Sequence, residues 1–107
     1  MSIEATDLRG YRLFSITENL GAGSDISELQ NLIQLALDEG YRRFALSFRP
    51  DSYLSSRVLA TIVRCFVYIE EAGGEVVLVL PSTQLKECIQ LLGFTELVRI
   101  ADSTDDL

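Results

Sequence analysis

The chain has 107 residues, the size of one domain and enough to bury a hydrophobic core. Hydrophobic residues make up 48% of it, and nine Lys and Arg against 16 Asp and Glu leave a formal net charge of −7. This acidic balance argues against a protein that binds nucleic acid or an anionic membrane, because both need a basic face. The chain has no histidine, which excludes Ser–His and Cys–His nucleophilic pairs and the usual imidazole zinc sites. We therefore expect a protein that is not an enzyme and that holds no cofactor or metal.

The two cysteines are expected to be small core residues rather than metal ligands, and a disulfide between them is left open as the less favoured alternative. Cys65 and Cys88 lie far apart, form no CxxC motif, and both stand in apolar surroundings. No apolar stretch is long enough to span a membrane, and the Met-Ser-Ile-Glu start does not resemble a signal peptide. We expect a cytoplasmic protein with no direct membrane insertion, folded as a single domain over residues 1–107.

The first elements are a strand and a helix. Residues 10–17 alternate between apolar and polar side chains, which predicts a strand, and a shorter strand is weakly indicated at 2–5. A helix is expected to begin at about Asp25, because Asp25 and Glu28 have the spacing of a capping box. Gly40 is expected to end this helix.

The remaining elements continue the alternation of strands and helices. Ser55 is expected to cap the second helix, and Gly93 to end the third. The order of strand, helix and strand from 43 to 80 predicts a parallel unit, and the whole pattern predicts an α/β fold with helices packed on a small mixed sheet of four to five strands. The expected segments are strands at 43–48, 75–80 and 97–100, and helices at 56–72 and 83–92.

The second helix carries more apolar residues than a core-facing stripe requires. That stripe consists of Leu59, Ile62, Val63, Phe66 and Ile69. Four further apolar residues widen it, namely Val58, Ala60, Cys65 and Val67. The additional surface is covered either by a neighbouring helix of the same domain, which is the simpler interpretation, or by a partner protein.

A polar face is expected on the same helix. Arg57, Thr61, Arg64 and Tyr68 follow each other at helical spacing, which is also typical of an ordinary solvated face. Arg57 is unusual because a cation in the first turn opposes the helix macrodipole unless an anion offsets it. Asp51 in the preceding loop is one source of that anion, and an acidic patch on a partner is the other.

The run Tyr53-Leu54-Ser55-Ser56-Arg57-Val58-Leu59-Ala60, followed by Gly73-Gly74 and an apolar strand, resembles the STAS domain family. The best-known members of that family are bacterial anti-sigma factor antagonists. The family pattern is an aromatic residue, an apolar residue, Asp-Ser-Ser-Gly-Leu-Gly, a helix, and then Gly-Gly and a strand. The later run Leu91-Leu92-Gly93-Phe94 also looks like the family's final helix and glycine turn, so the resemblance covers essentially the whole chain and implies a STAS-type fold.

The chain departs from the family pattern at the phosphorylation motif. In the family, the second Ser of Asp-Ser-Ser-Gly is phosphorylated by a cognate anti-sigma kinase, and the phosphate switches partner binding off. Arg57 stands at that position here and cannot accept phosphate, and Ser55 stands at the position of the Asp. Ser56 is a weak candidate for a displaced acceptor, because a shift by one position turns it about 100° around the helix.

The resemblance implies a non-catalytic protein-interaction domain that regulates signalling or transcription without the serine phosphoswitch. The expected partner is a kinase-like anti-sigma factor or another signalling protein with a STAS domain, and homodimer formation is left open. The candidate partner-binding residues are Ser55, Ser56, Arg57, Thr61 and Arg64.

Two alternatives remain open. The resemblance also allows an accessory subunit of a membrane transporter. A domain that binds a small ligand, such as a nucleotide or lipid, is the other alternative, since Gly21-Ala22-Gly23 follows a strand and precedes a helix. This run lacks the further glycine, Lys and Ser or Thr of phosphate loops, so a plain turn is the simpler interpretation.

Overall fold

The structure is a computed structural model that describes residues 3–93 and 98–107. In this part of the chain, five strands form one sheet in the order β1-β2-β3-β4-β5. β1 pairs antiparallel with β2, and the remaining neighbours pair in parallel, so the predicted mixed sheet is confirmed. The strands are β1 (Ile3–Leu8), β2 (Tyr11–Ile16), β3 (Arg43–Ser47), β4 (Glu75–Val79) and β5 (Arg99–Ala101), and the helices are α1 (Glu28–Asp38), α2 (Ser56–Glu71) and α3 (Thr83–Leu91).

The first strand is longer than the sequence predicts. It was expected at 2–5, but β1 extends to Leu8 and pairs along its full length with β2; Ser2 lies outside the described residues. Arg9 and Gly10 connect the two strands with φ of 51° and 87°, as a two-residue hairpin turn requires. The alternation that marks a strand is missing because the four central residues of β1 are all exposed.

The first helix begins three residues later than predicted, because Asp25 does not form a capping box. Its carboxylate accepts a hydrogen bond from the backbone N–H of Ser27 at 2.8 Å, which holds a turn ahead of the helix. Glu28 is the first residue of α1, and Ser27 makes no side-chain cap. The end of this helix before Gly40, where φ is +103°, is as predicted.

The last strand lies slightly later than predicted. It was expected at 97–100, and β5 covers Arg99–Ala101. Leu97 lies outside the described residues, so that part of the prediction is not assessed.

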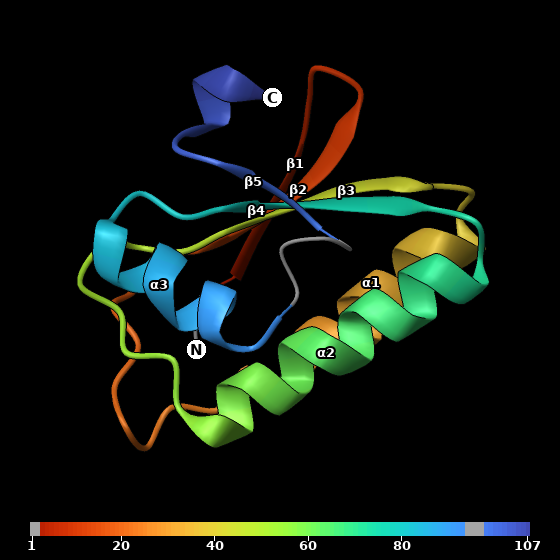
Figure 1. The fold of residues 1–107 in the computed structure, drawn as a ribbon. Coiled ribbons are helices and arrows are strands. Elements are labelled where there is room, and N and C mark those ends of the chain that lie inside the picture. Colours follow the sequence, from red (N-terminus) through yellow and green to blue (C-terminus); the bar gives the residue numbers. More distant parts are fainter. Residues whose placement is uncertain (1–2, 94–97) are drawn as a thin grey trace.

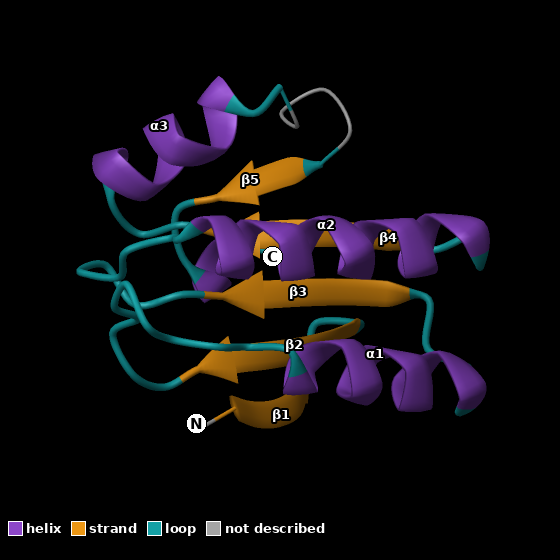
Figure 2. Ribbon diagram, turned by 90° about the horizontal axis from the view of Figure 1, so that it is seen from below, coloured by secondary structure: helices purple, strands orange, loops and turns teal. Residues whose placement is uncertain are grey.

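All three α-helices lie on one side of the sheet, and the C-terminal segment crosses the other side (Figures 1 and 2). The helical side holds the larger core, in which Phe14, Phe44 and Leu78 pack against the helices. A smaller cluster on the opposite side includes Leu13 and Val77. Both faces of the central strands are therefore buried, which explains the near-continuous apolar run of β4.

The core explains only part of the surplus apolar surface of α2. Val58 and Cys65 are fully buried within the domain, as the simpler interpretation predicts. Ala60 and Val67 are exposed, and Val67 keeps 44% of its surface accessible. Two of the four additional apolar residues thus face solvent on the outer side of α2.

Candidate functional site

The loop before α2 is held against the segment that follows β2. The backbone N–H of Tyr53 donates to the carbonyl oxygen of Leu20 at 2.8 Å, and the N–H of Leu20 donates to the Ser52 hydroxyl at 3.0 Å. Leu54 is buried beside these contacts. The side chain of Tyr53, by contrast, is 59% exposed, so a fixed backbone presents an aromatic ring to solvent.

Ser55 and Ser56 occupy the start of α2 in different ways. The Ser55 hydroxyl accepts a hydrogen bond from the backbone N–H of Val58 at 3.3 Å, which confirms Ser55 as the N-cap. Ser56 is the first residue of the helix and is exposed. Ser55 thus has a clear structural role in starting the helix, while Ser56 belongs to the accessible surface.

Arg57 lies near a different carboxylate from the one that the sequence suggests. Across residues 3–93 and 98–107, no ion pair joins Arg57 to Asp51. The Ser27 backbone N–H, which donates to the Asp25 carboxylate, lowers the pKa of Asp25, and the positive charge of Arg57 lowers it further. The charge of Arg57 therefore acts on a carboxylate in the turn before α1.

The predicted polar face of α2 is only partly exposed. Thr61 is 2% exposed, and its hydroxyl donates to the carbonyl oxygen of Arg57 at 3.3 Å within the helix. Tyr68 is half-buried beside Leu37 of α1. The expectation that Thr61 and Tyr68 share a solvated face with the two arginines is wrong, because α1 packs against that side of α2.

The exposed face of α2 runs from Arg57 at spacings of three and four residues. We call it the outer stripe, and it consists of Arg57, Ala60, Arg64, Val67 and Glu71. A helix places these five residues within about 80° of its circumference. The sequence analysis singled out Ala60 and Val67 as surplus apolar residues but did not place them on one face with the arginines, and it did not include Glu71. The helical spacing of the sequence is consistent with the outer stripe, but equally with the face toward α1. Arg57 and Arg64 belong to both faces, so spacing alone does not distinguish them.

The arginines of this region differ from the other cations of the chain. Within the described residues, six of the nine cations are held by internal partners. Arg12, Arg43 and Lys86 form ion pairs with Asp7, Glu75 and Asp102, and Arg9, Arg42 and Arg99 donate to backbone carbonyl oxygens. Arg49, Arg57 and Arg64 have no such ion pair or side-chain hydrogen bond in that part of the chain. These three lie in the connection from β3 to α2 and on the outer stripe.

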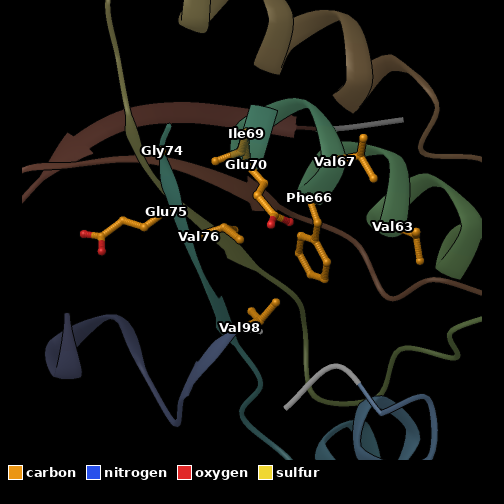
Figure 3. Close-up of a pocket in the computed structure, with 9 residues that line it drawn as sticks. All are labelled: Val63, Phe66, Val67, Ile69, Glu70, Gly74, Glu75, Val76 and Val98. Atoms are coloured by element: carbon orange, nitrogen blue, oxygen red, sulfur yellow. The ribbon is translucent and has the colours of Figure 1, made fainter. Parts of the chain in front are cut away.

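A hollow of about 290 Å³ flanks the outer stripe between α2 and the start of β4. Phe66, Val76 and Val98 face its middle, whereas Glu75 extends away from the other labelled side chains (Figure 3). The lining is mainly apolar, and Glu70 supplies a carboxylate from α2. A partner that covers the outer stripe would also meet this apolar hollow.

The remaining candidate groups are the two cysteines, the metal-binding side chains and the turn at Gly21. Cys65 and Cys88 are free thiols, and burial raises the pKa of Cys65 to about 12, which keeps it protonated. No group of three metal-binding side chains occurs among the described residues. Gly21 and Ser24 form an exposed turn, in which the Gly21 N–H donates to the Ser24 hydroxyl at 2.9 Å. None of the helices in the described part is both long and apolar enough to cross a bilayer.

Comparison with known proteins identifies the family. No curated protein matches the chain. The NMR structure of the protein TM1081 has a TM-score of 0.79 at 18% identity, over 99% of this chain and 85% of that one. A crystal structure of TM1081 from Thermotoga maritima, named there as a candidate anti-sigma factor antagonist, has a TM-score of 0.72 at 19% identity, over 97% of this chain and 89% of that one. These structures share the fold, and the STAS domain model matches residues 2–107, so the chain belongs to the STAS domain family.

Proposed function

We propose that this domain is a non-catalytic regulator that binds a signalling or transcription partner through the loop at 51–56 and the outer stripe. The observation that carries this proposal is the distribution of unpaired cations in an acidic chain. Arg57 and Arg64 lie on one exposed face of α2 without an ion pair in the described residues, next to the exposed apolar side chain of Val67. Arginines beside exposed apolar side chains are typical of protein-binding surfaces.

The charge of this surface points to an acidic partner. Arg57 and Arg64 are seven residues apart, which places them about 10 Å apart along the helix. Their guanidinium groups can each bind a carboxylate with two parallel hydrogen bonds. The exposed ring of Tyr53, on the anchored loop ahead of the helix, adds an aromatic contact at the same end of the surface.

We also propose that phosphate at the start of α2 does not regulate partner binding. Arg57 stands where the family resemblance places the acceptor, and the Ser55 hydroxyl is engaged in capping the helix. The partner is therefore bound without a serine phosphoswitch. Recovery of the protein from its own cells with phosphate on Ser55 or Ser56, detected by mass spectrometry of the peptides, would contradict this part of the proposal.

Affinity capture of the tagged protein from its native cells tests the partner class. We expect a kinase-like anti-sigma factor or another signalling protein with a STAS domain, identified by mass spectrometry. Recovery of transporter subunits instead would overturn the signalling role in favour of the accessory-subunit alternative. Saturable binding of a nucleotide or lipid at the apolar hollow, without a protein partner, would favour the small-ligand alternative.

A pair of matched variants tests the surface. Arg57→Gln with Arg64→Gln removes two positive charges from the outer stripe, and we expect it to weaken the captured partner's binding about tenfold or more. The control, Thr83→Glu with Gln90→Glu, changes the net charge equally at exposed positions of α3. Equal loss of binding in both variants, or in neither, would refute the assignment of the surface.

A further inference from the structure

The two ends of α2 carry charges that oppose the helix's own macrodipole. Arg57 lies in the first turn, near the positive end, and Glu70 and Glu71 lie in the last turn, near the negative end. The first turn has no acidic residue and the last has no basic one. The same charges would be favourable for a second helix that lies alongside in the opposite direction.

The outer stripe has room for a carboxylate over Ala60, between Arg57 and Arg64, and we call this position the carboxylate seat. Ala60 lies between Arg57 and Arg64 on the exposed face, three residues after one arginine and four before the other. Because alanine ends at Cβ, an approaching carboxylate has room to contact both guanidinium groups. The stripe also carries one carboxylate of its own, on Glu71, which is exposed and has no ion pair within the described residues.

Glu71 cannot use the seat of its own helix. Fourteen residues separate it from Arg57, which corresponds to about 21 Å along the helix axis. A second molecule can bring a carboxylate to this seat. The chain itself provides one with the correct charge, on the same face, at the other end of the stripe.

We propose that the outer stripe binds a second copy of this chain, with the two α2 helices antiparallel across a two-fold axis. In the register that places Glu71 of each copy opposite Ala60 of the other, Arg64 lies opposite the second copy's Val67. Each Glu71 then contacts Arg57 and Arg64 of the other molecule, and the aliphatic stem of Arg64 packs on Val67. A two-fold interface forms both seats at once, because every contact occurs twice.

The arrangement of the helices leaves this face accessible. α1 lies on one side of α2 and α3 lies on the other, with all three helices on the same side of the sheet (Figure 2). A single helix face buries less than the roughly 1,200–2,000 Å² of stable interfaces. The dimer is consequently weak, and it competes with any partner that uses the arginines of the stripe.

A charge-swap experiment on the purified protein tests the dimer. Variant A carries Arg57→Glu and Arg64→Glu, and variant B carries Glu71→Arg. In a homodimer of either variant, like charges meet at both seats. We therefore expect self-association to be at least tenfold weaker than in the wild type, measured by sedimentation equilibrium at protein concentrations near the wild-type Kd. Mixed in equal amounts, A and B restore opposite charges at both seats. With one of them fluorescently labelled, we expect the mixture to form the heterodimer about as well as wild type forms the homodimer.

Controls separate the interface from general effects of charge. Arg49→Glu and Glu87→Arg reverse exposed charges outside the outer stripe, and both should dimerise like wild type. If a reversed variant does not fold, the neutral pair Arg57→Gln with Arg64→Gln, and Glu71→Gln, should each weaken the dimer. A monomeric wild-type protein, dimerisation of either variant alone at wild-type strength, or a mixture that stays monomeric would overturn the proposal. Glu71→Arg also distinguishes the two uses of the stripe, since it weakens self-association but leaves the arginines that the proposed partner needs.

Discussion

Among the seven glycines of the chain, Gly74, between α2 and β4, leaves the least room for a side chain. A Cβ atom there would lie 2.5 Å from the carbonyl oxygen of Arg42 and 2.9 Å from Cγ2 of Ile69. Real Cβ contacts are not that short, so the backbone must move. Two hydrogen bonds oppose the movement: the N–H of Gly74 donates to Ile69 at 2.9 Å, and the N–H of Glu75 donates to Arg42 at 2.8 Å.

We expect Gly74→Ala to lower the free energy of unfolding by about 2–3 kcal/mol, in the range of overpacked buried sites. For a domain of this size, that loss corresponds to a fall in Tm of about 10 °C or more. Urea unfolding followed by circular dichroism measures the first quantity, and a thermal melt measures the second.

Two other glycines, Gly73 and Gly23, provide matched controls. Gly73 has φ of +77° but open space around a Cβ, so Gly73→Ala carries only the conformational cost of about 1 kcal/mol. Gly23 has neither a positive φ nor a close neighbour, so Gly23→Ala should change stability by less than about 0.5 kcal/mol or increase it slightly. If Gly74→Ala were no more destabilising than Gly73→Ala, the close approach of the Arg42 carbonyl to this turn would not be the reason for the glycine.

Two further predictions concern the cap of α2 and the buried thiol. Ser55→Ala removes the acceptor for the Val58 N–H and should lower the free energy of unfolding by about 1 kcal/mol, measured in urea, whereas Ser56→Ala should leave it nearly unchanged. Cys65 should react with iodoacetamide only after unfolding, which peptide mass spectrometry can follow, because it is buried and its pKa is raised from 9.0 to about 12. The unfolded chain releases this proton first, so the thiol's contribution to stability should decline as the pH rises from 9 toward 12, and Cys65→Ala should remove that component. Rapid labelling of Cys65 in the folded protein would contradict its place in the core.

Local signals in the sequence were sufficient for most of the fold. Ser55 before an apolar stripe and Gly73-Gly74 after it predicted α2 to within a residue, because capping and chain reversal depend on the residues at the ends themselves. The start of α1 was not predictable in the same way. An Asp with a Glu three residues later fits a capping box, but Asp25 instead bonds Ser27 two residues ahead, and both arrangements satisfy the same carboxylate.

The candidate site depended on tertiary packing, which the sequence does not specify directly. Arg57 and Arg64 belong both to the stripe through Thr61 and to the stripe through Ala60, and periodicity alone cannot choose between the two. The position of α1 decides, because it covers Thr61 and leaves Ala60 exposed. Packing also determines which carboxylate the charge of Arg57 acts on, since Asp25 is 32 residues away in sequence and Asp51 only six.

Arg57 stands where the family resemblance places the phosphorylated serine, and it also lies on the proposed binding surface. A phosphate at the start of a helix is favoured by the macrodipole, whereas a guanidinium there is disfavoured. Asp25 offsets that charge in part, but it does not form an ion pair with Arg57 within the described residues. In the proposed complexes, the remaining negative charge comes from another molecule, either an acidic partner or Glu71 of a second copy. If both bind, occupancy of the surface depends on protein concentration and on competition between the two.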